Sequence, residues 1–227
     1  MIEDLVKIIG VEFKDISLLQ QALTHRSYLN EHRDYKLDHN ERLEFLGDAV
    51  LELVVTEYLY KNYKNPEGEL TSWRAALVNG ENLAVISKKM GVEEFLLMSK
   101  GEARDTGRAR LYLLANAMEA IIGSIYLDQG YEKAEEFILK NITFNLGEVL
   151  ESKSYMDPKS YFQEKAQDVE KTTPIYKVLE EKGPDHDKHF IVGVFLNDDL
   201  VAKGEGNSKQ EAQREAAKNG LEEKGWN

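Results

Sequence analysis

The chain has 227 residues, of which 42% are hydrophobic, and it carries a formal net charge of −12. This length and composition suffice for one large or two modest hydrophobic cores and exclude a disordered chain. The acidic balance argues against binding of polyanions through bulk charge. The absence of cysteine excludes disulfides, zinc–thiolate sites and a thiol nucleophile.

The N-terminal segment predicts a protein of the cytoplasm. Glu3 and Asp4 lie where a signal peptide would carry basic residues. No apolar run approaches the roughly 18 residues that a membrane-spanning helix needs. Together with the lack of cysteine, these features lead us to expect a soluble cytoplasmic protein that does not associate with a membrane.

Residues 1–152 are predicted to be helical throughout, because their apolar residues recur at three- and four-residue spacings. Helix ends are predicted at glycines that close apolar runs, namely Gly10, Gly91 and Gly130. Asp15 and Thr71 lie where N-cap residues are expected. The segment "SKGEARDTGRARL", residues 99–111, has no periodicity and is predicted to be a mobile loop.

A change of pattern after residue 152 predicts a second domain. The polar residues 153–157 are expected to form a linker. Over 158–227, a helical segment is followed by three strand-like segments and by an alanine- and glutamate-rich helix with Ser208 as its N-cap. The residues 197–199 predict a short turn between the second and third strands. The expected fold class is an all-α N-terminal domain plus an α+β C-terminal domain of order α-β-β-β-α.

The stretch "HNERLEFLGDAVLELV", residues 39–54, predicts a helix with one acidic face. At 100° per residue, Glu41, Glu44 and Asp48 fall within about 60° of one another, and Phe45 points to the same side. A solvated acidic face would explain the acids alone, but an exposed aromatic and a glycine inside the helix suggest that this face is covered. The core side of the helix is predicted to carry Leu43, Leu46, Val50, Leu53 and Val54.

A second acidic element occurs in "LLANAMEAIIGSIYLD", where Asn116 and Glu119 are three residues apart on an otherwise apolar helix. Glu119 either lies at the surface rim of this helix or meets the first acidic face around a cation, because a buried carboxylate needs its charge compensated. Together with Glu44 and Asp48, these side chains would form an all-oxygen site. Mg²⁺ and Mn²⁺ favour such ligands.

Four collinear motifs resemble the ribonuclease III family: "ALTHRSYLN", "HNERLEFLGDAVL", "PEGELTSWRAALVNGENLA" and "LLANAMEAIIGSIYLDQG". The segments "DPKSYFQEKAQ" and "SKQEAQREAAKNGLE" resemble the double-stranded-RNA-binding domain of the bacterial members. The resemblance implies a homodimer that cleaves double-stranded RNA with Mg²⁺, for which Mn²⁺ substitutes, and without a small organic cofactor. It implies 5′-phosphate and 3′-hydroxyl ends with short 3′ overhangs, and roles in processing ribosomal precursors, messengers and other structured transcripts.

The same resemblance assigns roles to individual acidic residues. Glu44, Asp48 and Glu119 correspond to the family's catalytic, metal-binding carboxylates, and Asn116 to the fourth metal-site position. Glu41 and Glu67 correspond to further acids of the cleavage valley. Many relatives carry aspartate in place of Asn116, and an amide can ligate through its oxygen but brings no charge. The alternative function is therefore a catalytically impaired protein that binds double-stranded RNA.

Phe45 corresponds to an aromatic that inserts into the partner subunit, although packing in the core of its own chain is the alternative. For RNA binding, the resemblance implies three sets of contacts. These are Gln163 and Glu164 on the first helix of this domain, His186 in the loop "GPDHDKHF", and, at the start of the last helix, Ser208, Lys209, Gln213 and Arg214. The alternative for the His186 loop is a polar hairpin turn, and the alternative for Lys209 and Arg214 is a solvated helix face. Because few basic residues are present, we expect weak, salt-sensitive binding by this domain alone.

The arginines of the loop, Arg104, Arg108 and Arg110, could add contacts near the cleavage site. A third interpretation, independent of the resemblance, is an acidic helical scaffold for protein interactions joined to a small α/β module. Cleavage of an RNA duplex in Mg²⁺ separates the nuclease from both other interpretations, and duplex binding in Ca²⁺ separates the impaired nuclease from the scaffold.

Overall fold

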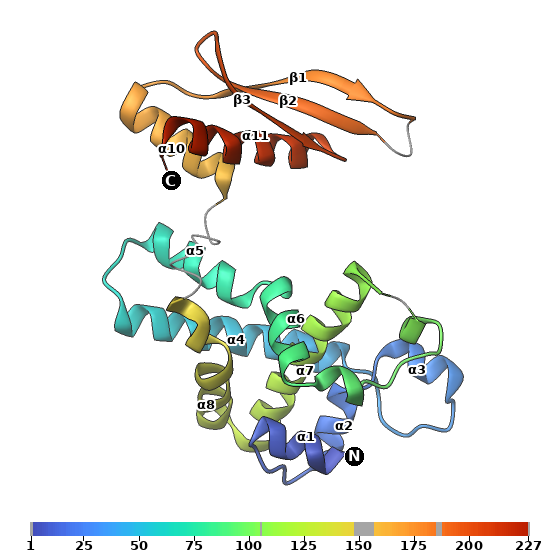
Figure 1. The fold of residues 1–227 in the computed structure, drawn as a ribbon. Helices are drawn as coiled ribbons and strands as arrows, with labels where there is room; N and C mark the ends of the chain where they lie inside the picture. The colour runs from blue at the N-terminus through green and yellow to red at the C-terminus, as the bar shows by residue number, and fades with distance from the viewer. Residues whose placement is uncertain (1, 105, 148–156, 185–187, 227) are drawn as a thin grey trace. The chain divides into compact units, whose positions relative to one another are not determined.

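A computed structural model describes residues 2–104, 106–147, 157–184 and 188–226. The chain folds into two compact units, Met1–Tyr155 and Met156–Asn227. We describe each unit by itself. Figure 1 shows a helical first unit and a second unit that combines a sheet with two helices.

The helical unit contains α1 (Ile2–Ile9), α2 (Ile16–Ala22), α3 (Arg26–Glu31), α4 (Glu41–Asn62), α5 (Glu67–Val78), α6 (Gly80–Lys89), α7 (Arg108–Gln129) and α8 (Tyr131–Asn141). Short 3₁₀ helices occur at η1 (Val92–Phe95), η2 (Glu102–Arg104) and η3 (Thr143–Asn145). Within the described part of this unit, the only β-type pairing is an isolated parallel bridge between Thr24 and Leu97. The helical prediction is therefore confirmed where the structure describes it.

Most of the predicted helix boundaries are correct. The Asp15 carboxylate accepts the N–H of Ser17 and caps α2. The three predicted terminal glycines follow helices in left-handed or related conformations, with φ of 73° at Gly10, 71° at Gly91 and 85° at Gly130. The N-cap prediction for Thr71 is wrong, because α5 already begins at Glu67, directly after Pro66. Proline ends the preceding extended segment, and acids in the first turn favour a helix start there.

Helix α7 is the centre of the unit and packs against α2, α4, α6 and α8. Its most extensive contact is with α4, and the two backbones approach each other closely where the helices cross. A Cβ atom added to Gly47 of α4 would lie 1.7 Å from the carbonyl oxygen of Glu119. One added to Gly123 of α7 would lie 2.2 Å from the carbonyl oxygen of Leu43. Both glycines are therefore required for this close approach, which repays the helix propensity that glycine loses.

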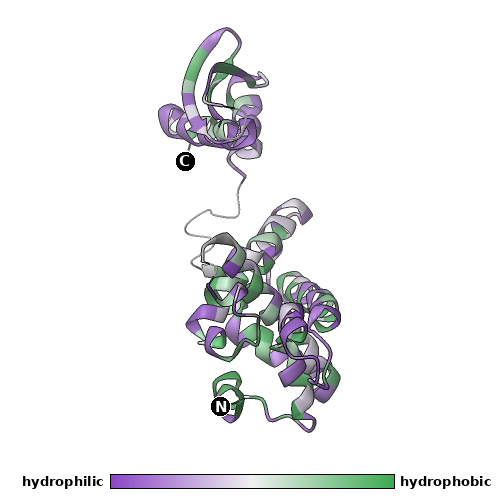
Figure 2. Ribbon diagram, turned by 90° about the vertical axis from the view of Figure 1, so that its right-hand side faces the viewer, coloured by the Kyte–Doolittle hydropathy of each residue, from purple (hydrophilic) through white to green (hydrophobic). Residues whose placement is uncertain are grey.

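The core side of α4 differs from the prediction at one position. Leu43, Val50 and Val54 are buried as expected, but Leu53 is 57% exposed. Hydropathy along the helices of this unit is mixed (Figure 2), as expected for helices that bury one face. The exposure of Leu53 adds an apolar side chain to the outer surface of α4.

By length and composition alone, the segment Ala109–Gln129 of α7 is long and apolar enough to cross a membrane, although Asn116 and Glu119 interrupt its apolar residues. Of its most apolar window, 56% is buried inside the unit. The central helix of a packed core has the same composition as a membrane span, because both are surrounded by apolar groups. Its position at the centre of the unit accounts for its hydropathy.

The segment predicted as a mobile loop, residues 99–111, is shorter than expected and is joined to α3. The backbone N–H of Ser99 donates to the Ser27 hydroxyl at 3.0 Å, and the short helix η2 follows. Helix α7 already begins at Arg108. The Arg110 guanidinium is largely buried and binds the Glu93 carboxylate at 2.7 Å.

The second unit has the predicted order, with α10 (Pro158–Glu170), β1 (Ile175–Lys182), β2 (His189–Leu196), β3 (Asp199–Gly206) and α11 (Lys209–Lys224). The strands form an antiparallel sheet in the order β1-β2-β3. Both helices lie on one face of the sheet (Figure 1), where Phe162, Val194 and Leu221 form the core. Ser208 caps α11, and Asn197 adopts a φ of 54° in the turn between β2 and β3, as expected.

Candidate active site and nucleic-acid interface

The start of α4 is fixed by buried polar contacts. Asn40 is 4% exposed, its Nδ2 donates to the carbonyl of Ala22 at 3.2 Å, and its backbone N–H donates to the carbonyl of Thr24 at 2.9 Å. Its own carbonyl accepts the N–H of Glu44. The end of α2 therefore sets the position of the first turn of α4, which carries the first acids of the site.

The crossing of α4 and α7 brings together the four residues predicted as metal ligands. Glu44 and Asp48 lie on α4 on either side of Gly47, and the carbonyl of Glu119 faces Gly47 across the crossing. Glu44, Asn116 and Glu119 are half-buried, whereas Asp48 is exposed. Of the two alternatives that the sequence left open for Glu119, the structure favours the one in which its helix meets the acidic face of α4, through a backbone contact between two glycine-containing helices.

The electrostatics of the site show that its carboxyl groups act on one another. Burial, followed by the Asp48 and Glu44 carboxylates, raises the pKa of Glu119 to about 7. Burial raises the pKa of Glu44, as do Glu41 and Asp48, while a hydrogen bond from Asn116 opposes this shift. In the described part of the chain, no basic side chain contributes to either pKa shift. Negative charge is therefore concentrated here without compensation.

The oxygen atoms of these four side chains are of the kind that a hard divalent cation prefers, but the side chains are not arranged as a complete coordination sphere. As the side chains stand, no three His, Asp or Glu residues within the described ranges are gathered closely enough to hold a metal ion. The mutual repulsion and raised pKa values of Glu44 and Glu119 nevertheless are the effects that a bound cation would relieve. Glu44, Asp48, Glu119 and the Asn116 amide oxygen are the residues that would hold it.

The two further predicted acids lie in different places. Glu41 is one turn before Glu44, and the Arg26 guanidinium is 3.5 Å from its carboxylate. Glu67 begins α5 and lines a cavity with Thr56 and Tyr60 of α4. At 1.5 Å per residue, this cavity is about 20 Å along α4 from Glu44. Within one subunit, Glu41 therefore lies on the turn of α4 next to the candidate metal site, whereas Glu67 lies far from it.

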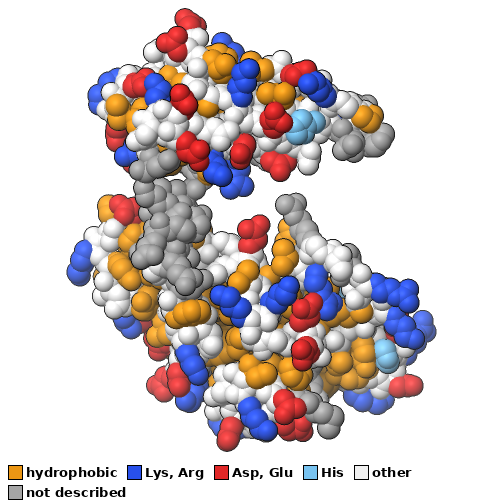
Figure 3. All heavy atoms as spheres, viewed as in Figure 1, with side chains coloured by type: hydrophobic (Ala, Val, Ile, Leu, Met, Phe, Trp, Pro, Cys, Tyr) orange, Lys and Arg blue, Asp and Glu red, His pale blue; other side chains and the backbone are white. Residues whose placement is uncertain are grey.

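Phe45 is 81% exposed, so the alternative that it packs in the core of its own chain is wrong. Leu53 and Tyr60, also on α4, are 57% and 77% exposed. Figure 3 shows apolar side chains among interspersed acidic and basic groups on the face of the helical unit that it presents. Such a set of exposed apolar side chains on one helix is typical of an interaction surface.

Most of the predicted RNA-binding residues that the structure describes in the second unit are exposed, Gln213 is half-buried, and several already have intramolecular partners. Gln163 and Glu164 face solvent on α10. The Arg214 guanidinium is 3.7 Å from the Asp157 carboxylate, and Gln213 accepts a hydrogen bond from Lys159 at 2.7 Å. The Ser208 hydroxyl accepts the N–H of Glu211, while His186 lies outside the described residues.

Sequence reasoning missed several neighbours of these sites. Asp157, Lys159, Ser160, Tyr176 and Gln210 line one hollow together with Gln163 and Arg214. Lys159 could have been found from the sequence, because it lies in the first turn of the same helix as Gln163 and Glu164. Arg26 lies inside a motif quoted for its resemblance and contacts Glu41, but its position in the sequence gave no indication of that contact. The Arg110 guanidinium is paired with Glu93, whereas Arg104 is exposed.

Comparisons with known proteins agree with this architecture. The Ribonuclease-III-like family matches residues 15–146, and the Double-stranded RNA binding motif matches residues 158–224. Ribonuclease 3 of Streptococcus gordonii is 44% identical over 214 residues, which cover 94% of this chain and 92% of that protein. Ribonuclease 3 of Oceanobacillus iheyensis is 43% identical over 222 residues, which cover 97% of each protein.

Among solved structures, the nuclease domain of ribonuclease III from Campylobacter jejuni is 46% identical, with a TM-score of 0.58. The alignment covers 64% of this chain and 98% of that domain. Fold, domain order and sequence identity together define a double-strand-specific endoribonuclease with an RNA-binding domain. The chain belongs to the ribonuclease III family.

Proposed function

We propose that the protein cleaves double-stranded RNA in a Mg²⁺-dependent reaction that leaves 5′-phosphate and 3′-hydroxyl ends, with the cleavage site at the crossing of α4 and α7. The observation that supports this proposal is the close approach of Gly47 to the backbone of Glu119, at the crossing of the two helices that carry Glu44, Asp48, Asn116 and Glu119. The coupled, raised pKa values of Glu44 and Glu119 support it.

The residues of the chain divide the chemical work. When bound, a divalent cation supplies an acidified water as nucleophile and positive charge beside the phosphate and the leaving 3′ oxygen. The exposed Asp48 carboxylate and the half-buried Glu44 and Glu119 carboxyl groups would hold the cation. The Asn116 amide, hydrogen-bonded to Glu44, fixes the orientation of that carboxylate. Proximity then makes attack on the phosphorus effectively intramolecular.

A second candidate function follows from Asn116. An amide in place of a carboxylate lowers the negative charge of the site, so a protein that binds duplex RNA and cuts it slowly or not at all is the alternative. Retention of Glu44, Asp48 and Glu119 supports the active enzyme. Cleavage by the unmodified protein decides between the two functions.

We further propose that the active form is a homodimer. Phe45 and Leu53 expose apolar surface on α4, and a cavity of about 730 Å³ lies between α4 and α5, lined by Leu59, Tyr60 and Leu70 among others. A twofold axis across α4 would bring Phe45 of one copy towards the far end of α4 in the other, where this cavity lies. The same arrangement would bring Glu67 of one copy towards the acids of the other. The Campylobacter jejuni structure is described as showing flexibility in a region involved in dimer formation.

The second unit is proposed to hold the RNA duplex by shape, through Gln163, Glu164 and the first turn of α11. Its acidic residues outnumber its basic ones, and Arg214 and Lys159 already contact Asp157 and Gln213; both features support weak, salt-sensitive binding by this unit alone. We place the enzyme in the cytoplasm, acting on ribosomal precursors and other structured transcripts.

The test is incubation with a long, perfect RNA duplex. Wild-type protein is expected to produce short fragments in Mg²⁺, and Glu119→Gln and Asp48→Asn are expected to lose at least about 100-fold in rate while still binding the duplex in Ca²⁺. Duplex binding without cleavage by the wild type would support the impaired enzyme. Cleavage that is equally fast in both variants would refute the proposed site.

A further inference from the structure

Glu41 is the third carboxylate, beside Glu44 and Asp48, on one face of α4. It precedes Glu44 by one turn of the helix, and its negative charge is the second-largest cause of the raised pKa of Glu44. A carboxylate one helical turn from Glu44 can compete with Glu44 and Asp48 to bind a cation at the site.

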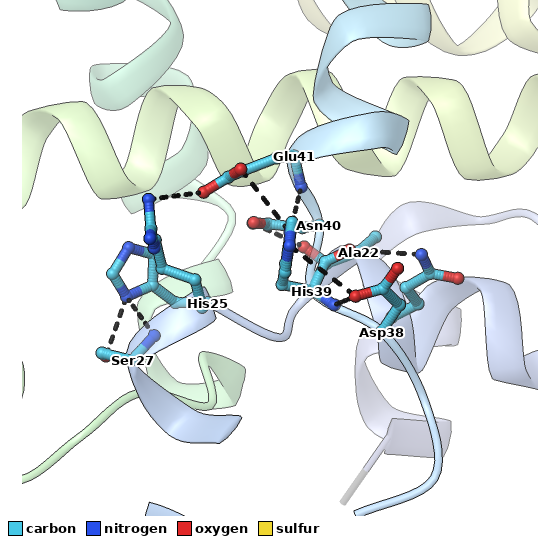
Figure 4. A network of polar contacts seen from close by, with 9 residues as sticks. Ala22, His25, Ser27, Asp38, His39, Asn40 and Glu41 are labelled. Carbon is cyan, nitrogen blue, oxygen red and sulfur yellow. Dashed lines mark hydrogen bonds and ion pairs between the residues drawn. The ribbon is translucent and has the colours of Figure 1, made fainter. Parts of the chain in front are cut away.

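The contacts of Glu41 come from outside α4 (Figure 4). The Arg26 guanidinium is 3.5 Å from Oε1 of Glu41. Nδ1 of His39 is 3.4 Å from the backbone nitrogen of Glu41, whose N–H it accepts when the ring is neutral, and it is 3.8 Å from Oε2. On its other side the His39 ring faces the Asp38 carboxylate at 3.7 Å. These contacts direct the Glu41 carboxylate towards α3 rather than along α4 towards Glu44.

The backbone at Arg26 is held in place by its neighbours, while the side chain itself is largely exposed. It is the first residue of α3, whose N-cap is His25, and the His25 ring bonds the Ser27 hydroxyl at 2.8 Å. The backbone N–H of His25 donates to the carbonyl of Leu97, and the Ser27 hydroxyl accepts the N–H of Ser99. The start of α3 is therefore attached to the segment that leads into η2, and the guanidinium projects from a fixed base.

We propose that Arg26 is a positioning residue that holds the Glu41 carboxylate out of the metal site, so that Glu44, Asp48, Asn116 and Glu119 alone bind the cation. This inference rests on the proposed function, because it assumes the metal site at the α4–α7 crossing. Loss of Arg26 would release Glu41, whose extra negative charge attracts a cation but displaces it from the position set by the other ligands. Metal binding then stays at least as tight while cleavage slows.

The test is a double-mutant cycle of Arg26→Gln, Glu41→Gln and the double variant in the full-length protein. Mn²⁺ binding is measured by calorimetry, and kcat is measured on an RNA duplex at saturating Mg²⁺. In the Glu41 background, Arg26→Gln is expected to lower kcat about threefold to fivefold, in line with an exposed ion pair, without weakening Mn²⁺ binding. In the Glu41→Gln background, the same substitution is expected to change neither quantity further.

Two additional variants separate positioning from a general loss of positive charge. Arg26→Lys keeps a cation beside Glu41 and is expected to recover most of kcat. Arg33→Gln removes an exposed arginine just beyond α3 and is expected to leave kcat unchanged. Equal losses of kcat from Arg26→Gln in both backgrounds, or weaker Mn²⁺ binding by Arg26→Gln, would overturn the inference while the proposed function stands. A wild-type protein that neither binds Mn²⁺ nor cuts the duplex would overturn both.

Discussion

Ionisation of the Glu119 carboxyl group is expected to lower the stability of the folded state, because the group is half-buried beside two other carboxylates. Its pKa of about 7 lies above the ordinary 4.5, so between these pH values the native state binds more protons than the unfolded chain. Its contribution is therefore most favourable below about pH 4.5 and is lost as the pH rises through 7. In chelator, Glu119→Gln is expected to melt several degrees above wild type at pH 8 and near it at pH 5, measured by thermal unfolding.

A suitable control for that experiment is Glu12→Gln, which removes an exposed carboxylate in the segment between α1 and α2. This variant is expected to show the same difference from wild type at both pH values. A melting-temperature difference for Glu119→Gln that does not change with pH would contradict the assigned pKa.

Asn116 sets the charge of the candidate metal site. Asn116→Asp adds a carboxylate beside Glu44 and removes the amide that donates a hydrogen bond to it. The added charge is expected to lower the Mg²⁺ concentration for half-maximal cleavage roughly fivefold, because affinity for hard cations follows ligand charge. Titration of cleavage against Mg²⁺ measures this effect. If neither the rate nor the metal requirement changes, Asn116 is not a ligand.

At the scale of helices, the α4–α7 crossing is the feature most sensitive to substitution. Gly47→Ala would improve helix propensity by about 1 kcal/mol, but its methyl group would collide with the backbone of Glu119. We expect a net destabilisation of about 1–3 kcal/mol by overpacking, together with loss of metal binding. Denaturant unfolding and Mn²⁺ calorimetry measure these two effects.

Gly68→Ala is the matched control, because a Cβ atom at Gly68 in the first turn of α5 meets nothing within 4 Å. This substitution is expected to leave stability unchanged or to raise it by up to about 1 kcal/mol. A Gly47→Ala variant as stable as Gly68→Ala would show that the two helices can separate at low cost.

Much of the fold and site could be predicted from local pattern. The spacing of apolar residues located the helices. A mid-helix glycine beside an aromatic and three acids indicated that the acidic face of α4 is covered by another element. The exposure of Leu53 could not be predicted, because periodicity alone does not reveal where the packing partner of a long helix ends. The pairs Arg26–Glu41 and Arg110–Glu93 join residues 15 and 17 positions apart, and their distances depend on tertiary structure. Thr71 was misplaced because a nearby proline started the helix earlier.

At the scale of the whole molecule, Phe45 is expected to determine assembly. Phe45→Ala removes an 81% exposed aromatic whose burial between two copies would contribute about 2 kcal/mol. The dimer dissociation constant, measured by sedimentation, is expected to rise by roughly tenfold or more, with cleavage activity falling in parallel. Phe144→Ala, which removes a 62% exposed aromatic on η3, is the control and is expected to leave assembly unchanged. Equal behaviour of the two variants would argue against Phe45 as an interface residue.

The direct meeting of two backbones at Gly47 and Gly123 also has a thermal consequence. Because no side chain separates α4 from α7 there, neither helix can tilt or slide without opening the core that both share. The two backbone segments that carry the side chains of the site therefore behave as one rigid support. On heating, the capacity to hold a cation should persist nearly unchanged and then vanish together with the helical unit in one cooperative step.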